Sequence, residues 1–137
     1  MDSRYKRPDN KNAISILEAA KKDMKFTLAI PVTKEAGATI ARNVYESFRM
    51  LGDALLIARG IESGDHIMPI NELMKTKVQA KRPINVVENL RRLRHNVNYY
   101  GYRPSIEEIK DVISIAESCF EPLAKEVEKK IISSRDI

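Results

Sequence analysis

The chain has 137 residues, of which 43% are hydrophobic and 31% charged, and its formal net charge is +5. No apolar run approaches the ~20 residues of a membrane span, and no apolar stretch of the signal-peptide kind follows the N-terminal residues. The single cysteine, Cys119, excludes an internal disulfide and a multi-cysteine zinc site. We therefore expect one cytoplasmic domain without a metal, a cofactor or a membrane association.

Apolar residues recur at helical spacing through most of the chain. Residues 1–11 are polar and charged, and we expect a flexible arm there, with Asn12 as the N-cap of the first helix. No segment alternates as a strand does. The predicted fold is therefore all-α, an up-and-down bundle of four main helices plus one short helix. The predicted helices cover residues 12–30, 33–59, 66–75, 84–99 and 105–133.

Local signals predict where these helices begin, bend and approach one another. Ser105 and Glu108 fit a capping box at the start of the last helix. Gly37 and Gly52 lie inside the second helix, where a glycine costs about 1 kcal/mol relative to alanine, so each indicates a close approach of another helix. Pro122 lies inside the last helix and predicts a kink or a break just before it.

Positive charge is concentrated between residues 76 and 103, where Glu88 is the only acidic residue. Such clustering favours an anionic partner, with phosphate the commonest candidate. The alternative is a solvated basic surface that binds nothing. The basic residues of this segment are Lys77, Lys81, Arg82, Arg91, Arg92, Arg94 and Arg103.

A helical wheel of residues 84–99 separates an apolar seam from a polar edge. The seam is expected to be buried and consists of Val86, Leu90, Leu93, Val97 and Tyr100. The edge that borders it consists of Arg94, Asn98, Arg91 and His95. An arginine at the boundary of a core needs an anionic partner, because an unpaired desolvated charge is costly. That partner is either Glu46 or Asp53 of the second helix, in a structural ion pair, or a bound phosphate.

Three of the five tyrosines, Tyr99, Tyr100 and Tyr102, follow at the end of this helix. Arginine and tyrosine together suit nucleic acid, because phosphates meet the cations and bases stack on the rings. Tyr100 continues the apolar seam, so we expect it to be a core residue. Tyr99 is expected to point the other way, and Tyr102 to lie beyond the helix.

The order and local sequence of the predicted helices resemble the HEPN superfamily of small α-helical domains, over about residues 10–132. The resemblance rests on a long second helix with the segment ARNVYES (41–47), a short middle helix and a long final helix. Between the last two lies LRRLRHNVNYYG (90–101). It implies a single HEPN-like domain over residues 12–133 that acts as a homodimer. Met50, Ile57 and Ile61 are apolar positions outside the main stripes that a dimer could use.

The family signature is an arginine followed, four to six residues later, by a histidine, with a polar residue commonly directly after the arginine. Arg94 matches the arginine and His95 the polar position, but Tyr99 stands where the histidine is first allowed. In active members the pair performs metal-independent RNA cleavage. The resemblance therefore gives Arg94, His95 and Tyr99 as candidate catalytic residues. The candidate phosphate-binding residues are Arg91, Arg92, Arg94, His95, Asn98 and Tyr102.

These observations leave three functions open. The first is a HEPN-like domain with a degenerate motif that binds nucleotide or RNA, with a small nucleotidyltransferase protein as a possible partner. The second is a metal-independent RNase of the toxin type. The third is a helical module that binds another protein and catalyses nothing.

Overall fold

The computed structural model describes residues 3–5, 7–65 and 67–134. It is an all-α bundle, as predicted, and contains five α-helices within these residues. The helices are α1 (Asn10–Leu28), α2 (Gly37–Ala58), α3 (Ile67–Met74), α4 (Val87–Tyr100) and α5 (Ile106–Ser134). A 3-10 turn, η1 (Ile84–Val86), leads into α4, and two short strands, β1 (Ser3–Tyr5) and β2 (Ile61–Ser63), complete the described elements.

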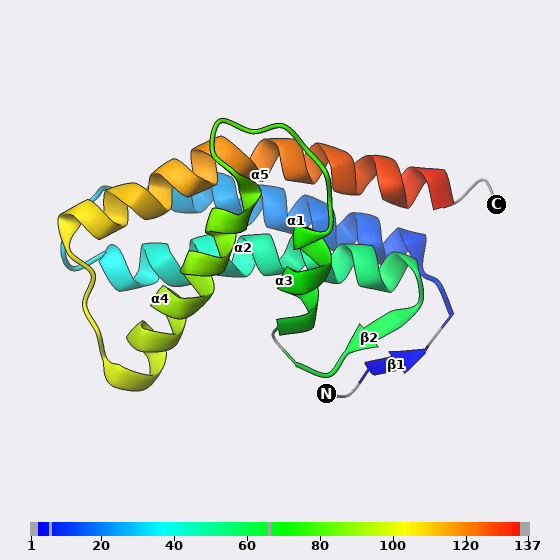
Figure 1. The fold of residues 1–137 in the computed structure, drawn as a ribbon, viewed down its shortest axis with the longest axis horizontal. Coiled ribbons are helices and arrows are strands. Elements are labelled where there is room, and N and C mark those ends of the chain that lie inside the picture. Colours follow the sequence, from blue (N-terminus) through cyan, green and yellow to red (C-terminus); the bar gives the residue numbers. More distant parts are fainter. Residues whose placement is uncertain (1–2, 6, 66, 135–137) are drawn as a thin grey trace.

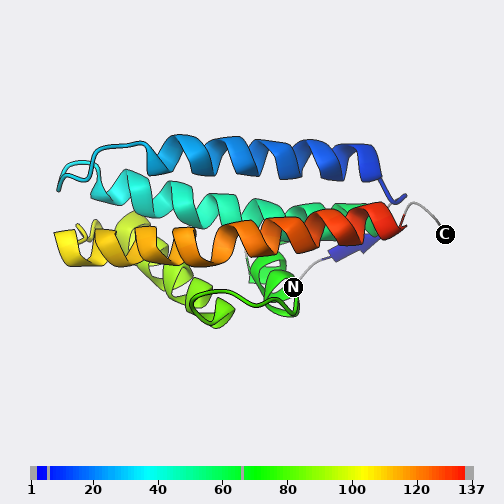
Figure 2. The ribbon, with the colours of Figure 1, turned by 90° about the horizontal axis from the view of Figure 1, so that it is seen from above.

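The three long helices lie side by side, with α1 antiparallel to α2 and α5 (Figure 1). Seen from above, α1 lies on one side of α2 and α5, and α3 and α4 lie on the other side (Figure 2). The helix α2 is the centre of the core, because Tyr45, Phe48 and Leu51 along it are buried. The ring of Phe48 meets that of Phe120 of α5 edge-on, with centroids 5.4 Å apart. No described helix is long and apolar enough to cross a membrane.

Gly37 and Gly52 both mark close approaches, as predicted, although α2 begins at Gly37 and only Gly52 lies inside it. A Cβ atom on Gly52 would overlap the backbone of Pro69, so α3 can cross α2 at this point only because the side chain is missing. A Cβ atom on Gly37 would lie 2.6 Å from Cδ1 of Ile109 in α5. The capping box is also present: the amide of Glu108 donates to Oγ of Ser105, and the amide of Ser105 donates to Oε1 of Glu108.

The N-terminal segment differs from the expectation of a flexible arm without strands. Residues 3–5 form β1, which pairs antiparallel with β2 so that Arg4 lies opposite Glu62. The first helix begins at Asn10, and its N-cap is Asp9, whose side chain accepts from the amide of Asn12. A three-residue strand is too short for the alternation on which strand prediction depends. His66, the predicted first residue of the short helix, lies outside the described residues.

The predicted kink or break at Pro122 is not a helix end, because α5 continues to Ser134. Buried residues flank the proline on both sides, with Phe120 before it and Leu123 and Val127 after it. A proline inside a helix costs about 3 kcal/mol. Burying large apolar side chains at about 1.5–3 kcal/mol each offsets that cost. The apolar positions noted for a dimer, Met50, Ile57 and Ile61, are all half-buried.

Candidate functional site

The helix α4 is packed on the bundle through one side and extends past it at its C-terminal end. Val87, Leu90 and Val97 are buried, and Leu93 packs against the core as a half-buried residue. The end of α4 lies beyond α2, away from the three long helices (Figure 1). Gly101 ends the helix with a φ of 62°, a left-handed conformation that glycine adopts without strain. Tyr99 and Tyr100, in the last turn of α4, are exposed.

On the edge of α4 that faces α2, the two helices bring cations together. The guanidinium of Arg94 lies over the buried ring of Tyr45, 5.6 Å from its centroid. One turn further along α4, Oδ1 of Asn98 accepts a hydrogen bond of 3.5 Å from Nη1 of Arg42. Arg91 belongs to the same edge and pairs with Glu88 of its own helix at 3.2 Å. We call Arg42, Arg91, Arg94 and Asn98 the basic edge.

The interpretation of Arg94 as half of a structural ion pair is wrong, because Arg49 of α2 binds both expected partners. Nη1 of Arg49 lies 2.7 Å from Asp53, and its other nitrogens form a two-pronged contact with Glu46. Arg49 precedes Asp53 by four residues and follows Glu46 by three, so all three side chains share one helix face. Arg94 forms no ion pair or hydrogen bond with any residue in the described ranges.

The arginines around the basic edge influence the pKa of Tyr45. Burial raises the pKa of its phenol, and the nearby guanidinium groups of Arg94, Arg49 and Arg91 act in the opposite direction. The phenol therefore stays neutral near pH 7 and cancels none of the positive charge. A half-buried guanidinium above a neutral aromatic face is oriented by cation–π attraction but is not neutralised, so it can still bind an anion.

The exposed end of α4 carries three rings, which we call the aromatic platform: His95 and the two tyrosines that its ring contacts, Tyr99 and Tyr100. The His95 and Tyr99 centroids are 4.6 Å apart with planes tilted by 39°, and Tyr100 meets His95 at 5.8 Å. Tyr99 is 68% exposed and Tyr100 is 76% exposed. The expectation that Tyr100 is a core residue is wrong. It lies on the seam side of the wheel, but at the last turn of α4 its side chain is exposed.

Three of the predicted phosphate-binding residues do not join the basic edge: Arg92, Tyr102 and His95, whose ring belongs to the aromatic platform. Arg92 lies on another side of α4, beside a groove of about 400 Å³ between α4 and α5 that also contains Glu107 and Asp111. Tyr102 donates a 2.6 Å hydrogen bond from its hydroxyl to Glu108, and this bond raises the pKa of the phenol. The structure therefore does not bring Arg92 or Tyr102 together with the residues of the basic edge.

Sequence reasoning missed two members of the site, Arg42 and Tyr45, which come from α2. Both lie in the segment that carries the resemblance to HEPN domains, but nothing in their spacing indicates which helix they face. Their relation to α4 depends on how α4 crosses α2, and a helical wheel of one helix does not contain that information. Within the described residues no cluster of three His, Cys, Asp or Glu side chains could hold a metal ion.

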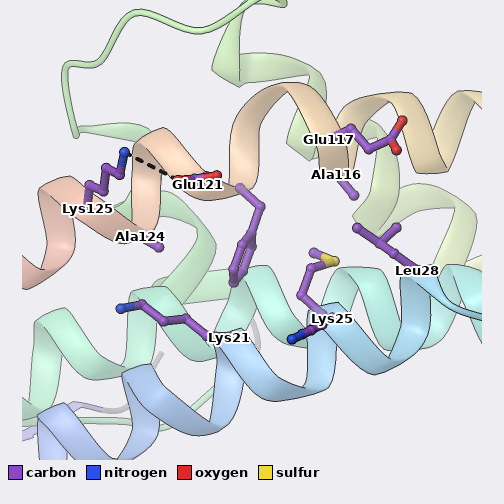
Figure 3. A pocket seen from close by; sticks show the side chains of 10 residues that line it. Lys21, Lys25, Leu28, Ala116, Glu117, Glu121, Ala124 and Lys125 are labelled. Carbon is purple, nitrogen blue, oxygen red and sulfur yellow. Dashed lines mark ion pairs between the residues drawn. The ribbon is translucent and has the colours of Figure 1, made fainter.

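A groove of about 540 Å³ lies on another part of the surface, between α1 and α5 (Figure 3). Its floor is apolar and includes Met24, Leu28 and Phe120. Its rim mixes charges, because Lys21 and Lys25 of α1 face Glu117, Glu121 and Lys125 of α5. Lys125 and Glu121 are themselves paired at 3.2 Å. This groove lacks the excess of cations that marks the basic edge.

Compared with known proteins, the chain matches no family model, no curated protein and no solved structure. The functional interpretation therefore depends on the geometry of α4 and on the sequence resemblance alone.

Proposed function

We propose that this chain is a HEPN-like domain that binds the phosphate of a nucleotide or RNA through the basic edge of α4. The observation that carries the proposal is the Arg94 side chain, a half-buried guanidinium without an anionic partner among the described residues. Removing a cation from water without a counter-ion is costly. A phosphate that accepts two parallel hydrogen bonds from the guanidinium would supply that counter-ion.

The neighbours of Arg94 support an anion of more than one charge. Arg42 and Arg91 come from two helices and lie on the same edge as Arg94. The pair between Arg91 and Glu88 is exposed, with side-chain exposures of 42% and 36%, and such pairs contribute at most about 1 kcal/mol. Arg91 can therefore exchange Glu88 for a phosphate at little cost.

Binding without cleavage is the form of the proposal that the residues favour. In the active members of the family, a histidine transfers the proton, and here Tyr99 stands in the first position where that histidine is allowed. The ordinary pKa of a tyrosine is about 10, so its phenol is a poor base near pH 7. His95 is the remaining imidazole on α4, and its ring contacts the two tyrosines of the aromatic platform.

The test is binding of a short labelled RNA and of a mononucleotide, measured by fluorescence anisotropy and calorimetry. Arg94→Ala is expected to weaken both by about 10-fold or more, because a hydrogen bond to a charged group contributes about 1.5–3 kcal/mol. Lys22→Ala is the matched control, since it removes one exposed cation from α1. It is expected to leave binding unchanged. Equal binding by Arg94→Ala and the natural chain would refute the proposal.

A second measurement separates binding from catalysis. The same RNA is incubated with the protein in EDTA, and we expect it to remain intact. Cleavage that His95→Ala abolishes while RNA binding persists would instead establish the metal-independent nuclease. The homodimer that the resemblance implies is tested by sedimentation at tens of micromolar, where a monomer would contradict it.

A further inference from the structure

The aromatic platform has no structural role within the described chain that would explain its composition. Tyr99 and Tyr100 are exposed in the last turn of α4, so their rings add little to the core. Exposed apolar residues that occur singly need no explanation, but rings gathered in one place indicate a binding surface. Here the ring of His95 contacts both tyrosine rings, over six residues of one helix.

We propose that the aromatic platform stacks unpaired nucleobases, so that the ligand of the α4 site is a single-stranded nucleic acid. This inference rests on the proposed function, because it takes the phosphate-binding role of Arg94 as given. Every nucleobase has a flat π-face, and stacking on tyrosine or histidine is the usual way in which proteins hold single strands. In a duplex the bases cover one another's faces, so the rings would have nothing to stack on.

The position of the platform relative to Arg94 fits a strand that binds both. Successive residues of an α-helix rise by about 1.5 Å, so Tyr99 lies about 7.5 Å further along α4 than Arg94. Nucleotides stacked in a strand are spaced by about 3.4 Å, so this offset corresponds to about two nucleotides. A dinucleotide step could therefore place a phosphate at Arg94 and a base on Tyr99.

The positions of the side chains around the axis of α4 also separate the arginines from the aromatic rings. Each residue turns the helix by about 100°, which places Arg94 closest to α2, then Arg91, then His95 and then Tyr99. The contact of Arg94 with Tyr45 of α2 agrees with this order. A strand that crosses this surface meets cations on one side and rings on the other, as a single strand with its bases turned away from its phosphates requires.

The probe that isolates the platform is an abasic oligonucleotide, which keeps the phosphates and lacks the bases. We expect a single-stranded RNA or DNA of eight or so pyrimidines to bind more tightly than the abasic strand and than a duplex of the same sequence. Tyr99→Ala is expected to weaken binding of the base-bearing strand by about 5- to 150-fold, the range for loss of one stacked base. It should leave the abasic strand unaffected.

Three variants make the experiment decisive. Tyr99→Phe keeps the ring and is expected to bind within about twofold of the natural chain. Phe26→Ala removes an aromatic ring of similar exposure, 71%, from α1 and is expected to change nothing. Arg94→Ala is expected to weaken the binding of base-bearing and abasic strands alike. Unchanged binding by Arg94→Ala would overturn the proposed function, whereas unchanged binding by Tyr99→Ala would overturn the platform alone.

Intrinsic fluorescence gives an independent readout, because the chain has five tyrosines and no tryptophan. Titration with the base-bearing strand is expected to quench tyrosine emission, because its bases stack on the rings. Titration with the abasic strand is expected to cause no such quenching. Tyr99→Ala should lose part of that quenching. Equal affinity for base-bearing and abasic strands, or a preference for the duplex, would refute the inference. Binding of another protein but of no oligonucleotide would do so as well. Comparing RNA with DNA shows whether the 2′-hydroxyl is also recognised.

Discussion

The affinity of the basic edge for a single-stranded nucleic acid is expected to fall steeply with salt, by an amount that the structure sets. Each phosphate of a single strand that a cation of the protein neutralises contributes about −0.7 to the slope of the logarithm of affinity against the logarithm of salt concentration. Arg42, Arg91 and Arg94 lie on one edge and could each neutralise one phosphate. Three contacts predict a slope of about −2, which corresponds to about a 20-fold loss of affinity between 50 and 200 mM salt.

Removing one guanidinium changes this slope as well as the affinity. Arg94→Ala leaves two contacts, so the expected slope is about −1.4 and the loss over the same range is about sevenfold. The assay is fluorescence anisotropy with a labelled pyrimidine strand at a series of KCl concentrations and fixed pH. Lys22→Ala, which removes an exposed cation of α1, should retain the slope of the natural chain. A slope near zero, or the same slope for Arg94→Ala and the natural chain, would show that these arginines do not contact phosphate.

The remaining predictions concern the fold that holds α4 in place. Gly52→Ala should lower the free energy of unfolding by about 1–3 kcal/mol in chemical denaturation, because the added Cβ meets backbone; Gly37→Ala should cost less, because it meets a movable side-chain end. Ser105→Ala should cost about 1 kcal/mol through loss of the N-cap of α5, and an unchanged denaturation midpoint would contradict this. Hydrogen bonds from the Tyr102 hydroxyl and then from Ser105 lower the pKa of Glu108 in the folded state. Its contribution to stability is therefore present above the ordinary value of 4.5 and lost as pH falls through the lowered pKa, so Glu108→Gln should reduce the fall in melting temperature between pH 6 and pH 3.

The order and type of the helices could be predicted because their signals are local. The apolar stripe of α2, the capping box of α5 and the close approach at Gly52 are each encoded by residues within one helix. The wheel of α4 also placed Arg94 correctly at the boundary of the core, where it is half-buried. These features follow from periodicity, which does not depend on what the helix packs against.

The errors come from features that only the packing of helices decides. The wheel gives Tyr100 the angle of a core residue, but whether that angle is buried depends on how far the neighbouring helices extend. The partner of an acidic residue is likewise chosen by distance in space. Glu46 and Asp53 had Arg49 within one turn on their own helix, and a local pair forms with less loss of conformational freedom than one between helices.

The pairing on α2 has a consequence for the charge of the whole site. Because Arg49 is bound to Glu46 and Asp53, these two carboxylates of α2 are already engaged, and they screen Arg49 rather than Arg94. Burial raises the pKa of Arg49's phenolic neighbour, Tyr45, so that this group adds no negative charge either. An anion that approaches α4 beside α2 therefore meets the field of Arg42, Arg91 and Arg94 with little opposition from α2. Arg49→Ala removes the cation that binds both carboxylates and so makes this face of α2 more negative. It is therefore expected to weaken phosphate binding although Arg49 itself need not touch the ligand.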